Sequence, residues 1–277
     1  MKKTLKQVTS ILLVVVLVVS TMAISAVSTS AAEVKNYQIT ITTGGHQGCS
    51  GDCYSYKIIG TKNSVEFTYT TMSLQKTTKS LSNCPDLGEI KSVVVSHWAG
   101  CDDIYINSIE ICDKSNSSTT VFYGGRWVGS DDEITFDKTD NVYLVTINTG
   151  SDSGAGTNED VYFTLIDENG NKTNQINGTG IHPATDAFEN SDSAKFYVCV
   201  PSDFGRINKV EIELKSDTAY RIIGIPLLFG IADLFNSDWD LASVSLKKLS
   251  GNSDVGKSQS KTINATLQTD DKYTVTF

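Results

Sequence analysis

The sequence predicts an all-β protein built from two tandem β-sandwich domains. Three observations support this fold class: short segments in which apolar and polar residues alternate, clusters of Gly, Asn, Asp and Ser between those segments, and a long internal repeat. Alternation at period two is typical of strands with one buried face. Many such strands separated by turn residues favour a sandwich or a barrel over a helical fold.

The repeat is clearest at two strands that end in Thr-Gly. Residues 37–44 read YQITITTG and align without a gap with residues 143–150, which read YLVTINTG. Three further pairs of segments match later in each copy: residues 86–95 with 203–212, 103–111 with 238–246, and 131–136 with 270–277. A repeat of this length indicates a duplicated domain and not a solenoid, whose units run to roughly 20–50 residues. We therefore expect one sandwich over residues 33–138 and a second over residues 139–277.

The first 32 residues predict a secretory signal peptide. Lys2, Lys3 and Lys6 precede an apolar run, and small residues follow that run up to Ala32. The run is shorter than the roughly 20 apolar residues that a membrane-spanning helix needs. We expect cleavage after Ala32 and a secreted protein. No lipid-modified Cys and no C-terminal anchor is indicated, so any attachment to a cell surface would be non-covalent.

The mature chain is expected to be acidic. The formal net charge of the whole chain is −9, and loss of the leader removes three lysines and no acid, which leaves −12. Nucleic acid binding relies on Lys and Arg side chains that neutralise phosphates, so we expect no nucleic acid partner. Direct attraction to an anionic lipid surface is also opposed, unless a cation bridges the two surfaces.

The opening of the second copy carries the most specific motif. Residues 143–170, YLVTINTGSDSGAGTNEDVYFTLIDENG, resemble the start of a PLAT (lipoxygenase-homology) domain, in which a strand and Thr-Gly precede a short loop, Ala-Gly-Thr-Asp and another strand. Residues 204–207 and 238–244 are similar to the later family pattern of a Leu-Gly-x-Ile turn and Asp-Trp-x-Leu-x-x-Val. In the first copy, residues 122–128, FYGGRWV, resemble the closing Phe-x-x-x-x-Trp-Leu of the family. The resemblance covers most of the mature chain and is stronger in the second copy.

This resemblance implies two eight-stranded antiparallel sandwiches that bind a lipid surface or a protein partner, often with calcium at one end. In lipoxygenases, pancreatic lipases and a clostridial phospholipase toxin, such domains accompany a catalytic domain. This sequence contains only three His residues and no nucleophile elbow, phosphate loop or zinc-protease motif. We therefore expect a non-catalytic binding protein. The alternative is a carbohydrate-binding or cell-surface adhesion protein, because a β-sandwich alone does not fix function.

The resemblance also implies a set of calcium ligands. Calcium takes about six to eight oxygen ligands from carboxylates, amides and backbone carbonyls on flexible loops. In the second copy, the family's positions correspond to Asn158, Asp186 and Asp238, with Asp152 and the backbone near Gly154 and Gly156 as further donors. Asn158 replaces a carboxylate with a neutral amide, which should weaken the site. In the first copy only Asp52 and Asp103 match, and the middle loop contributes no acid.

These Asp and Asn residues have a second interpretation. Both residue types form Asx-turns in loops very often, without any metal.

An apolar insertion distinguishes the second copy from the first. Residues 222–235 read IIGIPLLFGIADLF, where the first copy has only a short loop. Pro226 and Gly230 interrupt any single strand or helix across the run. One hypothesis is a loop that contacts a membrane or a partner through Ile225, Leu227, Leu228 and Phe229. The other is a plug that packs inside the protein.

The first copy contains a group of thiols and imidazoles in two loops: His46, Cys49 and Cys53 in one, and His97 and Cys101 in the other. Their spacings are irregular beside established zinc motifs, and thiols of exported proteins more often oxidise. We therefore favour a disulfide from Cys101 to Cys49 or Cys53 over a zinc site. Trp98 could contact a lipid or a sugar, or it could pack within its loop. The sequence does not predict the oligomeric state.

Overall fold

The computed structural model describes residues 33–46, 54–69, 76–98, 103–129, 131–182, 187–215, 238–251 and 254–277. Residues Lys35–Phe277 form one compact unit. Strands dominate the described residues, and they form four antiparallel four-stranded sheets. The prediction of two tandem eight-stranded antiparallel β-sandwiches is therefore confirmed. The predicted signal peptide lies outside the described residues.

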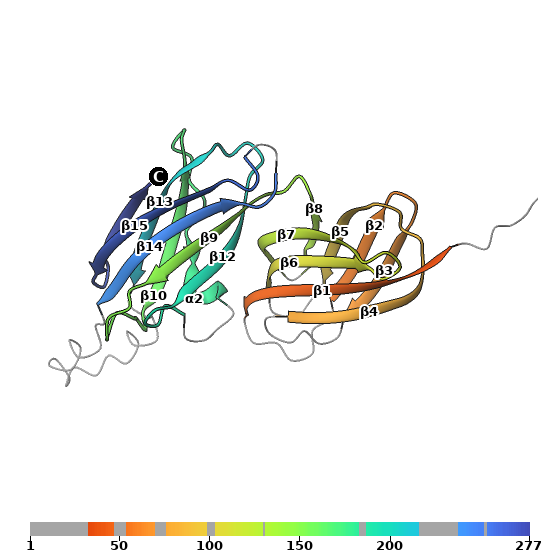
Figure 1. Cartoon of the computed structure of the whole chain (residues 1–277), viewed down its shortest axis with the longest axis horizontal. Helices are drawn as coiled ribbons and strands as arrows, with labels where there is room; N and C mark the ends of the chain where they lie inside the picture. Colours follow the sequence, from red (N-terminus) through yellow and green to blue (C-terminus); the bar gives the residue numbers. More distant parts are fainter. Residues whose placement is uncertain are drawn as a thin grey trace, which may run out of the picture. The chain divides into compact units, whose positions relative to one another are not determined.

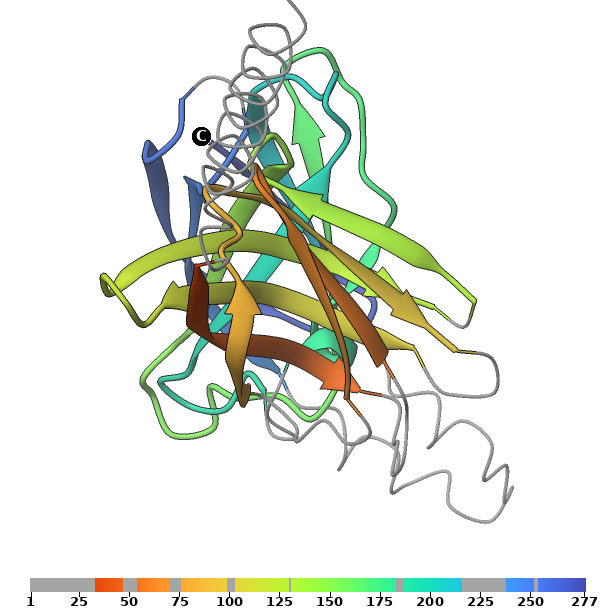
Figure 2. The ribbon, with the colours of Figure 1, turned by 90° about the vertical axis from the view of Figure 1, so that its right-hand side faces the viewer.

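The first sandwich contains eight strands in two sheets. One sheet has the order β4-β1-β6-β7 and the other has the order β3-β2-β5-β8 (Figure 1). The strands are β1 (Val34–His46), β2 (Tyr54–Gly60), β3 (Ser64–Tyr69), β4 (Lys76–Pro85), β5 (Ile90–His97), β6 (Ile104–Asp113), β7 (Ser118–Val128) and β8 (Glu133–Asp137). Figure 2 shows these strands in orange to yellow-green.

The second sandwich repeats this arrangement. Its sheets have the orders β12-β9-β14-β15 and β11-β10-β13-β16. The elements are β9 (Asn141–Thr149), β10 (Asp160–Asp167), β11 (Ile176–Asn177), α2 (Gly178–Ile181), β12 (Ser193–Val200), β13 (Ile207–Lys215), β14 (Trp239–Lys248), β15 (Ser258–Leu267) and β16 (Lys272–Thr276). The two sandwiches have the same strand order, so that β1 corresponds to β9, β2 to β10, and so on up to β8 and β16. The segments that match in sequence therefore lie on equivalent strands of the two sandwiches.

Each sandwich has its own hydrophobic core, which follows from the alternation along its strands. In β9 the burial of successive side chains alternates from Tyr143 to Thr149, with Val145 and Ile147 fully buried. In β13 the same alternation buries Val210 and Ile212. Side chains at alternate positions point to one face of a sheet, so each pair of sheets encloses a continuous apolar layer. The two cores form separate clusters of buried residues.

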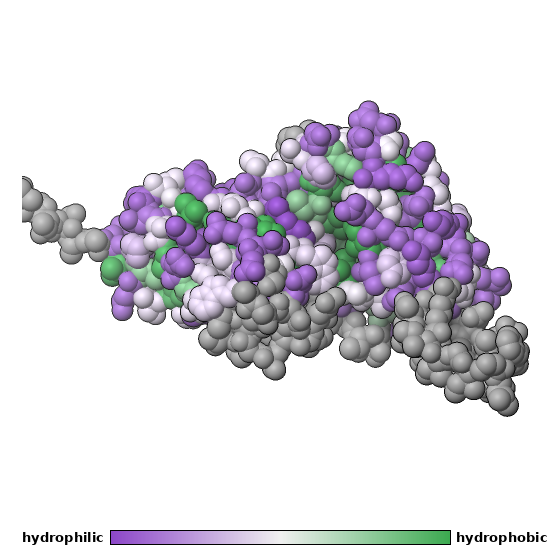
Figure 3. Space-filling view, turned by 180° about the vertical axis from the view of Figure 1, so that it is seen from behind, coloured by the Kyte–Doolittle hydropathy of each residue, from purple (hydrophilic) through white to green (hydrophobic). Residues whose placement is uncertain are grey.

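One face of the molecule is mainly polar in its described part (Figure 3). Figure 3 shows a face covered mostly by hydrophilic residues, with hydrophobic residues in smaller areas. Trp98 is one of three large hydrophobic side chains that are exposed in the described part of the chain, at 52 %. Among the described residues, no helix has the length and apolar character needed to span a bilayer.

Candidate functional site

The loop from β9 to β10 is fixed against the start of β14 by backbone hydrogen bonds. The Gly150 amide donates to the Asp240 carbonyl at 2.7 Å, and the Asp240 amide donates to the Ala155 carbonyl at 3.0 Å. Asp238 stands two residues before Asp240 in the chain, so it lies at the same end of the sandwich as this loop. We call this end, with residues 150–160, 238–240 and 268–271, the loop end.

The structure brings most of the predicted calcium ligands of the second copy to the loop end. The side chains of Asp152, Asn158 and Asp238 are exposed. Gly154 has a φ of +90°, which favours glycine because a side chain there is strained. A Cβ at Gly156 would lie 2.9 Å from the Asn190 nitrogen, so the loop passes too close to that turn for a larger residue.

Trp239 anchors the loop end to the core. Its side chain is fully buried, and its indole nitrogen donates to the Thr149 hydroxyl at 3.1 Å. Its ring meets the Phe188 ring edge-on at a centroid distance of 5.4 Å. Because Trp239 follows Asp238 and Thr149 precedes the β9–β10 loop, this one side chain holds both segments in place.

The predicted apolar insertion is attached to the sandwich at this same end. Asp160 pairs with Lys215 at the end of β13, and Leu241 near the start of β14 pairs with Thr149. The connection from Lys215 to Trp239 therefore leaves and re-enters the sandwich beside the β9–β10 loop. The insertion itself lies outside the described residues, and with it the predicted contact residues Ile225, Leu227, Leu228 and Phe229.

Glu159 adds a buried carboxyl group that sequence reasoning missed. It is 7 % exposed, and its Oε1 accepts a hydrogen bond from the Thr269 hydroxyl at 2.6 Å. Its Oε2 is buried without a hydrogen-bond partner. Burial raises the pKa of Glu159, the Thr269 hydroxyl lowers it, and the nearby Asp270 raises it further. β10 starts one residue after Glu159. The only sequence signal for the burial of Glu159 was that it continues the alternation of β10 by one residue.

The donor set at the loop end suits calcium, although it is incomplete among the described residues. Carboxylates, an amide and backbone carbonyls are the oxygen donors that calcium prefers. No group of three or more His, Cys, Asp or Glu side chains in the described ranges is placed to hold a metal. Asp186, the third predicted ligand from the second copy, lies outside those ranges. Calcium therefore stays a prediction.

Fewer of the predicted site residues of the first sandwich belong to the described residues. Asp103 is exposed, whereas Asp52, Cys49, Cys53 and Cys101 lie outside the described residues. The predicted disulfide is therefore untested.

His97, next to the exposed Trp98, is buried in the first sandwich. Its ring stacks on Tyr54 with a centroid distance of 4.6 Å and an interplanar angle of 12°. Both ring nitrogens are buried without a hydrogen-bond partner. Its packing on Tyr54 is that of a core side chain.

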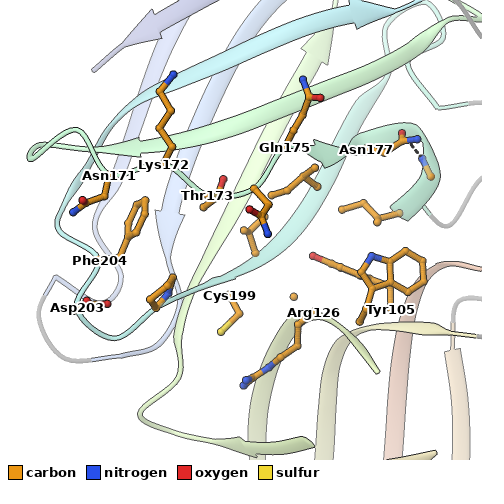
Figure 4. A pocket seen from close by; sticks show the side chains of 18 residues that line it. Tyr105, Arg126, Asn171, Lys172, Thr173, Gln175, Asn177, Cys199, Asp203 and Phe204 are labelled. Carbon is orange, nitrogen blue, oxygen red and sulfur yellow. Dashed lines mark hydrogen bonds between the residues drawn. The ribbon is translucent and has the colours of Figure 1, made fainter. Parts of the chain in front are cut away.

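A groove of about 880 Å³ lies beside β7 and the segment that leads into β11 (Figure 4). Tyr105 meets Trp127 edge-on at a centroid distance of 5.3 Å, and the Tyr105 hydroxyl donates to the Tyr197 carbonyl at 2.6 Å. Burial raises the pKa of the Cys199 thiol in the groove wall. The polar and aromatic lining includes Tyr105, Arg126, Trp127, Asn171, Gln175, Asn177 and Phe204.

Comparison with known proteins identifies the second sandwich. Residues 143–277 match the family model of the PLAT/LH2 domain. No curated protein matches the chain. The match does not extend to the first sandwich, so its assignment as a second PLAT domain stays a prediction. The match covers the strands and the loop end of the second sandwich, so residues 143–277 are similar to a PLAT/LH2 domain.

Proposed function

We propose that this chain is an exported binding protein whose PLAT/LH2 domain docks on a lipid surface through its loop end, with calcium as a bridge. One observation carries the proposal. The connection that contains the apolar insertion 222–235 starts and ends at the same end of the sandwich as Asp152, Asn158 and Asp238. Apolar side chains and calcium ligands at one end would let a single face insert into a lipid surface and bind its headgroups.

The charge of the loop end explains why calcium would be needed. Asp152, Glu159, Asp238, Asp240 and Asp270 all belong to this end of a chain whose net charge is −9. Anionic headgroups repel such a surface. A calcium ion held by the exposed carboxylates would neutralise two negative charges of this end and would accept phosphate oxygens of the lipid as further ligands.

Liposome flotation tests this proposal. Full-length secreted protein is mixed with anionic vesicles, with millimolar calcium or with chelator. We expect flotation only with calcium, and a loss of about tenfold in binding for the Asp152→Asn/Asp238→Asn double variant. Asp203→Asn is the matched control, since it removes an exposed carboxylate away from the loop end. Equal flotation of both variants would contradict the proposal.

The apolar segment is tested separately. Leu228→Asp together with Phe229→Asp should abolish flotation and leave the melting temperature unchanged. Val255→Asp is the control, because Val255 is a hydrophobic residue 52 % exposed at the other end of the same sandwich. A large fall in melting temperature of the double variant would instead support the internal plug. Calcium-dependent capture of a protein, without flotation, would favour a protein partner.

Carbohydrate binding is the second candidate, and the groove beside β7 favours it. Its wall combines partly buried Trp127 and Phe204 with the amides of Asn171, Gln175 and Asn177. Aromatic faces and planar amides suit the apolar faces and hydroxyl groups of sugars. A pull-down on insoluble polysaccharides, with Trp127→Ala as the variant and Trp98→Ala as the control, separates this role from lipid docking. Carbohydrate binding would be supported if the polysaccharide retains the wild-type protein and the Trp98→Ala control but not the Trp127→Ala variant.

A further inference from the structure

A second pocket lies at the end of the PLAT/LH2 domain opposite to the loop end. It has a volume of about 190 Å³ and is lined by Tyr143, Arg206, Leu246, Lys248, Asp254, Lys257, Ser258 and Gln259. Tyr143 lies near the start of β9, Lys248 ends β14 and Ser258 starts β15, whereas the loop end joins the other termini of these strands. The volume is smaller than the roughly 300–1,000 Å³ of pockets for drug-sized ligands, so it suits a small group.

Lys248 is the unusual residue of this pocket. It occupies the buried row of β14, two residues after Leu246, and it is 7 % exposed. No carboxylate of the described residues lies within ion-pair distance of its ammonium group, whose aromatic neighbour is Tyr143 at 5.5 Å from the ring centroid. Burial lowers the pKa of Lys248, and the Asp254 charge partly offsets this effect. The side chain of Lys248 is enclosed, its ammonium group lines the pocket, and the Asp254 charge acts on it without an ion pair.

Two more cations belong to the same pocket. The Arg206 Nη2 donates to the Gln259 side chain at 2.9 Å, which leaves most of its five N–H donors for other groups. The Lys257 ammonium is paired with Asp254 at the pocket rim. Three basic side chains and one carboxylate line the pocket, which leaves two positive charges in excess. Glu168 lies outside the lining, although its charge acts on Tyr143.

We propose that this pocket binds a phosphate group, with Lys248 and Arg206 as the main donors and Lys257 at the rim. A phosphate monoester carries about −1.5 to −2 charges at neutral pH, which matches the excess positive charge. Arg and Lys both form charge-assisted hydrogen bonds to phosphate oxygens. The bound group would also place an anion directly against the Lys248 ammonium, on which the charge of Asp254 acts only at longer range.

Thermal melts with inorganic phosphate test the site. They are done on the full secreted chain in chelator, so that the loop end does not contribute. At constant ionic strength, 10 mM phosphate should raise the melting temperature by about 2–4 °C relative to chloride. Lys248→Met keeps the length of the side chain and removes the charge, so this variant should lose the rise. Lys195→Met is the matched control, because Lys195 is exposed on β12 of the same sandwich, and it should keep the rise.

A second pair of variants keeps the test decisive if Lys248→Met does not fold. Lys257→Gln changes a rim side chain that is 75 % exposed, and it should weaken phosphate binding several-fold without loss of folding. Asp254→Asn removes the opposing carboxylate and should tighten binding. No melting shift in the wild-type protein would overturn the proposal. An equal shift in Lys248→Met and Lys257→Gln would overturn it as well.

The source of the phosphate group is decided with vesicles in chelator. Vesicles of phosphatidic acid and phosphatidylcholine are compared with phosphatidylcholine alone. If the wild-type protein floats with the phosphatidic acid vesicles and Lys248→Met does not, the phosphate group is a lipid headgroup. If phosphate shifts the melting temperature and the protein does not float, the phosphate group is soluble. Both results support the pocket. These experiments contain no calcium and leave the loop end unchanged. A negative result therefore says nothing about calcium-dependent docking. A failure of calcium-dependent flotation, in turn, says nothing about the phosphate pocket.

Discussion

The two ends of the second sandwich differ in the side chains that the same strands place there. At the loop end, β9, β14 and β15 lead into segments rich in Asp and Glu, including Asp152, Glu159 and Asp270. At the opposite end, Lys248 is the last residue of β14, Lys257 precedes β15 and Arg206 precedes β13. A net charge of −9 for the chain therefore conceals a local basic pocket.

A β-sandwich offers a separate surface at each end of its strands. Antiparallel strands return the chain to both ends, so residues far apart in sequence gather at each end while the core between them stays apolar. Burial shifts the pKa of Glu159 at one end, and of Lys248 and Tyr143 at the other, toward the neutral form of each group.

The largest effect is expected at the anchor of the loop end. Trp239→Ala should lower the free energy of unfolding by about 3–5 kcal/mol, because it leaves a cavity beside Phe188 and removes the hydrogen bond to Thr149. Trp239→Phe should cost less and should weaken the calcium response more than the phosphate response. Chemical denaturation with each ligand measures both. An equal weakening of the two responses would mean that the ends are coupled through the core.

A smaller loss of stability is expected where the β9–β10 loop contacts the turn at Glu189 and Asn190. Gly156→Ala should destabilise the domain by about 1–3 kcal/mol, because the new Cβ would lie about 3 Å from the backbone of Glu189 and Asn190. Gly170→Ala is a useful contrast, since a Cβ there meets no atom within 4 Å and only its φ of +87° opposes the change. Similar losses of melting temperature in both would show that backbone strain, and not the close approach, sets the cost at Gly156.

The pH dependence of Glu159 gives a signature of the loop end. Its folded pKa is raised, so its contribution to stability is complete below the unfolded pKa of about 4.5 and is lost as the pH rises through the folded pKa. Glu159→Gln keeps the acceptor for Thr269 and removes the titration. The variant should therefore gain about 0.5–1 kcal/mol over the wild type at pH 7 and little below pH 4. A constant difference between pH 4 and pH 7 would contradict this assignment.

The smallest effect is expected at the opposite end without phosphate. Lys248→Met removes a buried ammonium and should raise the free energy of unfolding at pH 7 by up to about 1 kcal/mol. The folded pKa of Lys248 is lowered, so the wild type gains stability as the pH rises from that pKa to the unfolded value near 10.5. The advantage of the variant should accordingly shrink toward pH 10. Denaturation curves at pH 7 and pH 10 check this sign.

Much of the fold could be predicted from the sequence, because its signals are local. The alternation in residues 37–44 and 143–150 and the Thr-Gly at the end of each predicted two equivalent strands, which the structure contains as β1 and β9. The candidate ligands Asp152 and Asn158 were also visible, since they share one loop.

The rest of the site depends on strand pairing. The position of Asp238 beside the β9–β10 loop follows from the hydrogen bonds of Asp240, which no local pattern predicts. Lys248 was not singled out from the sequence. Its burial follows from its position on the buried row of β14, after Val244 and Leu246. Its neighbours Arg206 and Lys257 reach it from other strand ends, and only the register of the sheets brings the three together.

A backbone-amide NMR titration of the secreted protein tests the separation of the two ends most directly. Calcium should shift the amides of residues 150–160 and 238–240, and phosphate should shift those of Arg206, Lys248 and residues 254–259. Each ligand should leave the amides of the other end unchanged. Absence of calcium shifts at the loop end, or one set of shifts for both ligands, would contradict the account.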